Sequence, residues 1–443
     1  MPLIGHRMLL ARTERNKPMR TAIKTLIPPL LILSLFTATW SVETADYTPG
    51  KLYNYTHESG TIPKGDYQYS VYVPTDYSPK KSYPVVFYLH GGGRGRFHPD
   101  QGKRNMVSDR LKDNKRTTDA GYSRNVPDFI GYILISPVKP VAKWNATVFK
   151  RLLKHVKSKV SVDENRVYVT GFSMGGQGTW IVACGNDGSY KIAAMMPLGA
   201  WGCRQVKRGT TPQTCKTLKT AVWNLHCPQD PVSKISEQLP LFQSHLDLGG
   251  YGRFTMIPGR GHISRPRGND HAFFSMRMAW MLSQTYGTPF NYVLKVNDGK
   301  IGKVSSGKRP FTGDTSGYGF YEPGTVVNIT APESKGDKPF VKWASDQGKF
   351  AEATSRSTSF TTPEGDVTIS AIYGKQPFKL SVVGGKANPA APKPGEIVTV
   401  SASTDKFFYW KTDSKLIDIA LPNARSFKFA MPSADVTITA QGK

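Results

Sequence analysis

A serine stands between two glycines where an apolar run gives way to a helix-forming one. The stretch Val167–Trp180 reads VYVTGFSMGGQGTW, and its centre, Gly171–Gly175, has the pattern G-x-S-x-G. A serine hydroxyl becomes a useful nucleophile only when it is held exposed beside a base and beside groups that stabilise an oxyanion. Glycines at these positions let a strand fold sharply into a helix, so that the serine projects. The pattern therefore predicts that Ser173 is a catalytic nucleophile.

An acid and a histidine follow this serine in the chain order that such a site requires. Asp230 follows the apolar run AVWNLHC, and His262 follows the run FTMIP, so each comes after a predicted strand. Side chains at the carboxyl ends of neighbouring parallel strands meet at one edge of a sheet. We expect Asp230 to fix the tautomer of His262. We expect His262 to take the proton of Ser173 and to return it to the leaving group.

Other carboxylates and histidines are weaker alternatives for these two roles. Asp247 and Asp270 are the alternative acids, but neither follows a predicted strand. His271 lies in or beside the last predicted helix, and His226 lies inside a strand-end run, so we interpret both as structural.

A glycine run after an earlier strand supplies groups for an oxyanion hole. The run YPVVFYL ends in Leu89 and is followed by His-Gly-Gly-Gly, whose backbone N–H groups can point at a developing charge. We expect one donor to be the N–H of Met174 and the other that of Gly92, which is favoured over Gly91. A phosphate-binding loop is a weaker interpretation, because neither Lys-Ser/Thr nor G-x-G-x-x-G spacing accompanies the glycines. No C-x-x-C pair occurs, so we expect no zinc or redox site, and we assign no cofactor or metal ion to the chain.

The elements that must position these residues alternate in type from about Tyr67 to Tyr286. Six β-branched runs read as buried strands: YPVVFYL, YILIS, RVYVT, IAAMMPL, AVWNLHC and FTMIP. The segments VFKRLLKHVKS and HAFFSMRMAWMLSQ have apolar residues at helical spacing. This alternation predicts an α/β domain with a mostly parallel sheet, which we assign to residues 46–288.

The last third of the chain contains two copies of one pattern. The blocks YVLKVNDGK, EPGTVVNIT, PFVKWAS and FTTPEGDVTISA recur in the same order as FKLSVVGGK, KPGEIVTVS, FFYWKTD and FAMPSADVTITA. This duplication predicts two small all-β repeat modules, the first module at residues 290–374 and the second module at residues 376–443. Trp343 and Trp410 are expected to fill their cores. Sugar stacking by Trp410 is the weaker interpretation.

Both regions resemble known families. The motifs LHGGG, SVDENRVYVTGFSMGGQGTW, HCPQDPV and GRGH resemble the α/β-hydrolase esterases of the polyhydroxybutyrate-depolymerase and feruloyl/acetylxylan esterase group, over about Tyr67 to Tyr286. That resemblance implies an α/β-hydrolase fold and serine-dependent ester hydrolysis without a metal, with catalytic residues at Ser173, Asp230 and His262. The two modules resemble the divergent bacterial repeats related to the internalin-type B repeat, which occur on exported surface proteins.

The N-terminal segment has the layout of a secretory signal peptide. Basic residues precede the apolar run LIPPLLILSLFTATW, and small residues follow up to Ala45. The run is shorter than the about 20 apolar residues of a transmembrane helix, and it contains two prolines. Residues 1–45 are therefore assigned to a signal peptide, with Met8 and Met19 as alternative starts and cleavage near either Ser41 or Ala45. No transmembrane span is expected in the mature chain.

Export permits disulfides among four cysteines, of which we favour the pair Cys203–Cys215 because they flank a polar, loop-like stretch. The buried free thiol is the alternative for Cys184 and Cys227.

The chain is strongly basic, with 59 lysines and arginines against 32 aspartates and glutamates and a net charge of +27. Such a charge suits an anionic polysaccharide or cell surface, and without a recognition motif no nucleic acid is expected. The sequence thus predicts a secreted or cell-surface serine carboxylic-ester hydrolase that acts on polymeric or polysaccharide-linked esters, with surface attachment through the repeats. A serine peptidase of the prolyl-oligopeptidase type and a surface adhesin with a non-catalytic hydrolase fold are the alternatives.

Overall fold

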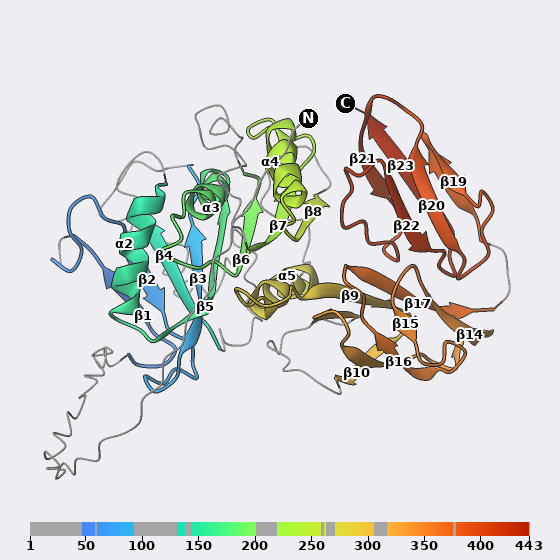
Figure 1. Ribbon diagram of the computed structural model, residues 1–443, viewed down its shortest axis with the longest axis horizontal. Coiled ribbons are helices and arrows are strands. Elements are labelled where there is room, and N and C mark those ends of the chain that lie inside the picture. The colour runs from blue at the N-terminus through green and yellow to red at the C-terminus, as the bar shows by residue number, and fades with distance from the viewer. Residues whose placement is uncertain are drawn as a thin grey trace, which may run out of the picture. The chain divides into compact units, whose positions relative to one another are not determined.

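The apolar runs of the first part of the chain form one eight-stranded sheet (Figure 1). The computed structural model describes residues 47–57, 60–92, 131–138, 144–200, 219–257, 261–262, 271–304, 317–374 and 378–442. The strand order is β1-β2-β4-β3-β5-β6-β7-β8. Strands β3 to β8 are parallel to one another, whereas β2 runs antiparallel to both of its neighbours, β1 and β4. The strands are β1 Leu52–Tyr55, β2 Gln68–Tyr72, β3 Tyr83–Leu89, β4 Ile133–Val138, β5 Val162–Phe172, β6 Ala194–Leu198, β7 Ala221–His226 and β8 Gly252–Met256.

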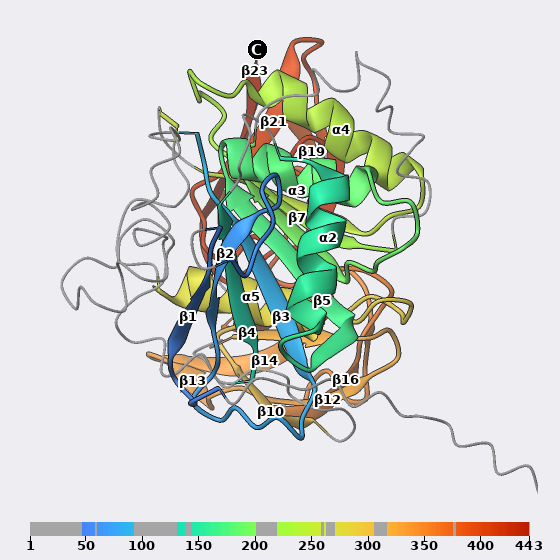
Figure 2. The ribbon, with the colours of Figure 1, turned by 90° about the vertical axis from the view of Figure 1, so that its left-hand side faces the viewer.

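Helices cover both faces of this sheet, because its parallel strands are apolar on both sides. They are α2 Ala146–Lys157, α3 Met174–Cys184, α4 Ile235–Asp247 and α5 His271–Ser283. In β3, Phe87 belongs to the core that includes residues of α2, α3 and α4, whereas the next residue, Tyr88, belongs to the core that includes residues of α5. Figure 2 shows α2 and α3 in front of the sheet and α5 behind it. The predicted α/β-hydrolase architecture is confirmed.

The C-terminal part consists of two modules that share a core of two three-stranded sheets, to which the first module adds three short strands. In each, the first strand runs parallel to the last, β9 beside β17 and β18 beside β23. A register shift precedes the tryptophan in both, between Phe340 and Lys342 and between Phe407 and Tyr409. The strands are β9 Tyr292–Asn297, β10 Lys300–Val304, β11 Tyr318–Tyr321, β12 Val326–Thr330, β13 Ser334–Lys335, β14 Lys338–Ser345, β15 Lys349–Phe350, β16 Ser357–Thr361, β17 Val367–Tyr373, β18 Leu380–Val383, β19 Gly385–Asn388, β20 Ile397–Ala402, β21 Phe407–Thr412, β22 Ser426–Ala430 and β23 Val436–Gly442. The matching topology supports the predicted duplication.

The two tryptophans pack as predicted. Trp343 and Trp410 are buried in separate cores, one in each module. Each indole N–H donates to a backbone carbonyl of its own module, that of Ser355 at 3.1 Å and that of Ala424 at 2.9 Å. Trp410 is therefore a core residue.

The edge strand β8 contacts both modules within the compact unit Val42–Lys443. The N–H of Phe254 donates to the carbonyl of Ala420 at 3.0 Å, which pairs a donor that the sheet edge would otherwise leave open. The buried guanidinium of Arg253 forms ion pairs with Asp366 at 2.5 Å and with Asp418 at 2.7 Å. The modules thus share buried polar contacts with the sheet.

The cysteines do not pair as predicted. Cys184 is disulfide-bonded and Cys227 is a buried thiol, so only Cys203 or Cys215 is left as the partner of Cys184. The prediction of a Cys203–Cys215 pair is therefore wrong. It rested only on the polar sequence between these two cysteines, which does not show whether one of them bonds instead to Cys184 at the end of α3. Both lie outside the described residues.

The predicted signal peptide, residues 1–45, also lies outside the described residues. Among the residues that the structure describes, no helix has the length and apolar character needed to cross a membrane.

Candidate active site

Ser173 lies on a strained turn between β5 and α3. Its φ of 59° and ψ of −118° are unusual for a residue with a side chain. The turn is fixed to the end of β6, since the N–H of Ser173 donates to the carbonyl of Leu198 at 2.9 Å. Gly175 is needed because a Cβ there would overlap the carbonyl oxygen of Leu89. The strand–turn–helix context predicted for the G-x-S-x-G motif is present.

The hydroxyl of Ser173 is not used to cap the helix that follows. Ser173 occupies the N-cap position of α3, yet its side chain makes no capping hydrogen bond. The unpaired N–H groups of the first helical turn carry a partial positive charge, which favours an anion at this end of the helix. The hydroxyl therefore stands beside groups that stabilise negative charge.

The glycine run after β3 lies against this turn. A Cβ built on Gly91 would lie 3.3 Å from the Cβ of Ser173, and one built on Gly92 would lie 2.8 Å from the Cε of Met174. The imidazole Nδ1 of His90 donates to the carbonyl of Gly91 at 2.8 Å, which helps to fix the run. The two residues expected to supply oxyanion-hole donors, Gly92 and Met174, are thus neighbours.

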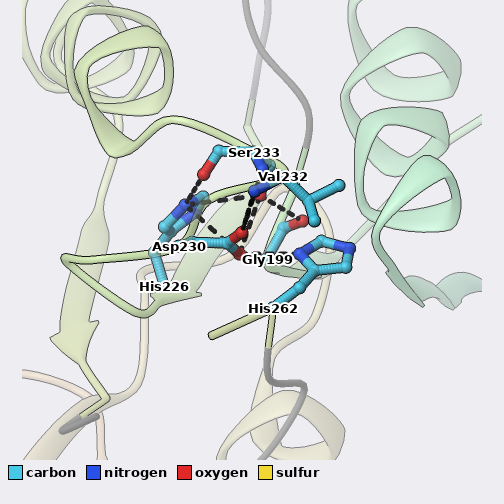
Figure 3. A network of polar contacts seen from close by, with 6 residues as sticks. All are labelled: Gly199, His226, Asp230, Val232, Ser233 and His262. Carbon is cyan, nitrogen blue, oxygen red and sulfur yellow. Dashed lines mark hydrogen bonds and ion pairs between the residues drawn. The ribbon is translucent and has the colours of Figure 1, made fainter. Parts of the chain in front are cut away.

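Asp230 and His262 are brought together from the carboxyl ends of β7 and β8 (Figure 3). The Nδ1 of His262 lies 2.7 Å from the Oδ2 of Asp230, and since a carboxylate can only accept, Nδ1 carries the proton. The other nitrogen, Nε2, is buried and has no hydrogen-bond partner among the described residues. The ring centroid of His262 is 4.7 Å from that of Phe172, the residue before Ser173. The imidazole therefore lies beside the serine turn with a lone pair on Nε2.

The carboxylate of Asp230 is buried and almost fully hydrogen-bonded. Its Oδ1 accepts the N–H of Val232 at 2.8 Å and that of Ser233 at 3.0 Å. Its Oδ2 accepts from His262 and from the hydroxyl of Ser233, which is 3.0 Å away. Burial raises the pKa of Asp230, but the bonds from His262, Ser233 and Val232 outweigh it and leave that pKa below its ordinary value. The carboxylate is therefore ionised at neutral pH.

Ser233 and His226 extend this network behind Asp230 (Figure 3). The hydroxyl of Ser233 also lies 3.0 Å from the carbonyl oxygen of Gly199. The Nε2 of the fully buried His226 donates to the carbonyl of Ser233 at 2.8 Å and lies 4.0 Å from the Oδ2 of Asp230. Burial lowers the pKa of His226, which favours the neutral imidazole. Ser233 therefore bonds directly to Asp230, and His226 bonds to the backbone of Ser233 behind it.

Sequence reasoning missed the role of Ser233, although a signal was present. Asp230-Pro231-Val232-Ser233 has the composition of an Asx turn, in which an aspartate accepts the N–H groups that follow it.

Asp247, one of the alternative acids, does not join this arrangement. Asp247 is exposed at the end of α4, where it accepts from the Nε2 of Gln243 at 2.9 Å. His271 begins α5, and Asp270 lies outside the described residues. Over the described part of the chain, no group of three or more His, Cys, Asp or Glu side chains could hold a metal ion. The arrangement is that of a serine hydrolase of the α/β-hydrolase fold.

Comparison with known proteins identifies the first module. Residues 292–377 match the family described as the divergent InlB B-repeat domain, which confirms the predicted resemblance there. No curated protein sequence matches the chain.

Solved structures with a similar fold include esterases and peptidases. They include a thermostable esterase, which is 20% identical with a TM-score of 0.35 over 53% of this chain and 63% of its own. A truncated carbohydrate esterase from gut microbiota is 14% identical, with a TM-score of 0.35 over 49% of this chain and 91% of its own. An acylaminoacyl peptidase is 12% identical, with a TM-score of 0.39 over 55% of this chain and 42% of its own.

Proposed function

We propose that the chain is a secreted serine carboxylic-ester hydrolase with Ser173, Asp230 and His262 as its catalytic triad. The observation that carries the proposal is the 2.7 Å bond between His262 and Asp230 beside the strained serine turn. This bond leaves the lone pair of the imidazole on Nε2, the nitrogen that a general base needs.

The first half of the reaction transfers the acyl group to the enzyme. The Oγ of Ser173 attacks the ester carbonyl carbon while the Nε2 of His262 takes the hydroxyl proton. The carbonyl oxygen becomes an oxyanion, and the N–H groups of Met174 and Gly92 stabilise it. The C–O bond to the leaving alcohol then breaks, and the imidazolium returns its proton to that alcohol. An acyl-serine remains.

The second half repeats these steps with water as the nucleophile. Neutral His262 removes a proton from the water, which attacks the acyl carbon, and then protonates Oγ as the acid product departs. Asp230 stays ionised throughout and stabilises the imidazolium that forms in each half. No cofactor enters this scheme.

The proposed substrates are polymeric or polysaccharide-linked esters, with an anionic polysaccharide as one candidate. The basic composition of the chain supports attraction to such a polymer. We further propose that residues 1–45 direct export and that the modules attach the enzyme to a cell surface, as the resemblance to exported repeats suggests. A serine peptidase with the same triad is the alternative reaction.

A substrate panel separates these functions. Purified chain is incubated with nitrophenyl acetate, a feruloyl ester and a peptide anilide, with Ser173→Ala as the control. We expect turnover of the esters that Ser173→Ala abolishes, and turnover of the anilide alone would instead identify a peptidase. No turnover of any substrate by the folded wild type would leave the adhesin alternative.

A further inference from the structure

A cavity of about 470 Å³ lies between the second module and the carboxyl edge of the large sheet. One wall consists of the loop after β7 and the end of β8, and the other of β21, β23 and the segment after β21. The side chains that line it include Gln229, Thr255, Tyr409, Lys411, Thr412 and Gln441.

The two walls are held together by several kinds of contact. Phe408 and Leu421 of the second module pack against the core of the α/β domain. The backbone bond from Phe254 to Ala420 and the ion pair between Arg253 and Asp418 lie on the same segment. The cavity is therefore a built feature of the fold.

The cavity opens on the edge of the sheet that carries the triad. Gln229 directly precedes Asp230, and Thr255 lies at the carboxyl end of β8, the strand after which His262 follows. Three strand spacings, roughly 14 Å in all, separate β5, which leads to Ser173, from β8, whose end lines the cavity. A ligand that reached from the cavity to the serine turn would have to be an extended polymer.

The second module differs from the first at the face that lines this cavity. Tyr409 and Gln441 are directly opposed across β21 and β23, so their side chains share one face. The aligned pair in the first module is Lys342 and Ile372. There, Ile372 is buried against Ala430 of the second module. The equivalent face of the second module carries an aromatic and an amide side chain and lines the cavity.

The chemistry of the lining suits a saccharide chain. The partly exposed ring of Tyr409 offers an apolar surface for the C–H face of a sugar, with Gln441 beside it. Gln229 on the opposite wall and Thr412 offer hydrogen-bond donors and acceptors for hydroxyl groups. Lys411 adds an exposed ammonium group.

We propose that this cavity binds the saccharide chain of an ester-bearing polysaccharide and so places the second module in the substrate site. The proposal rests on the proposed esterase function, because the bound chain presents its ester to Ser173. It gives the duplicated modules different roles, since only the second contributes a wall.

Kinetics on two substrates test the proposal. Tyr409→Ala and Gln441→Ala are compared with Val383→Ala, which changes an exposed side chain of the same module outside the cavity. We expect a roughly tenfold rise in KM for acetylated xylan with Tyr409→Ala, equivalent to about 1.4 kcal/mol, and a smaller rise with Gln441→Ala. The kcat/KM for nitrophenyl acetate and the thermal midpoint should match those of Val383→Ala. An unchanged KM for the polymer in both cavity variants would overturn the proposal.

Binding without catalysis separates this proposal from the esterase function. The full chain with Ser173→Ala is titrated calorimetrically with ester-free xylohexaose and with an oligogalacturonide of the same length. We expect at least one of the two oligosaccharides to bind, and we expect Tyr409→Ala to weaken its affinity about tenfold. Lys411→Ala should weaken the affinity for the oligogalacturonide alone. Binding of neither would overturn the proposal while nitrophenyl acetate turnover left the esterase standing. Failure of that turnover in the wild type would count against the esterase and leave the binding result intact.

Discussion

Replacing Asp230 by asparagine should disable the base without unfolding the site. The Oδ1 position accepts two backbone N–H groups, at 2.8 Å and 3.0 Å. An amide nitrogen turned toward them would leave both buried donors unsatisfied, at about 1–3 kcal/mol each. Even the lower total of about 2 kcal/mol favours the opposite amide orientation by roughly thirtyfold. The NH₂ group then faces the Nδ1 of His262 and forces the tautomer whose Nε2 carries the proton.

That tautomer cannot accept the proton of Ser173, so kcat should fall by about 10⁴. The assay is hydrolysis of nitrophenyl acetate at pH 7, with a thermal melt to show that Asp230→Asn is folded. Asp247→Asn is the matched control, because Asp247 is exposed and contacts Gln243. A fall of less than about tenfold for Asp230→Asn, or a larger effect of Asp247→Asn, would refute the tautomer argument.

Three further perturbations test the surroundings of the site. Ser233→Ala removes one hydroxyl bond to Asp230 and should lower the free energy of unfolding by about 1 kcal/mol and kcat by roughly tenfold; an unchanged kcat would remove Ser233 from the positioning network. Burial lowers the pKa of His226 and of His245 in the folded chain. As the pH falls through about 6.5, the unfolded state therefore binds more protons than the folded state does. Urea unfolding should therefore give a smaller free energy at pH 5 than at pH 7, and an equal or larger value would contradict this reasoning. Arg253→Met removes the buried guanidinium and leaves its two partly buried carboxylate partners uncompensated, which should cost about 3 kcal/mol in the same assay; a loss below about 1 kcal/mol would show that β8 does not depend on the modules.

Much of the fold could be predicted from the sequence because its signals are local. Strands β3 and β7 are buried throughout, β8 is buried over its first three residues, and turn residues follow each of them. The order serine, acid, histidine places one polar side chain after each of β5, β7 and β8. The blocks around Trp343 and Trp410 repeat closely enough to reveal the duplication, since one large side chain dominates each small core.

The features that sequence reasoning missed depend on distant or irregular geometry. Helix α4 contains Pro240, which interrupts the helical pattern. Arg253 reads as a surface charge at the start of a strand, because its partner Asp418 lies 165 residues away. Ser233 holds the acid only through a turn that Asp230 itself organises. The disulfide of Cys184 could not be chosen among three connectivities, since cysteine spacing alone does not report distance in space.

Covalent labelling decides whether Ser173 is the nucleophile. The wild-type chain is treated with a fluorophosphonate ester, which reacts with activated serines, and the modified peptide is located by mass spectrometry. We predict a single adduct on Ser173, no adduct in Ser173→Ala, and much slower labelling in His262→Ala, because the hydroxyl then lacks its base. An adduct on another residue, or equal labelling of wild type and Ser173→Ala, would contradict the assignment of the active site.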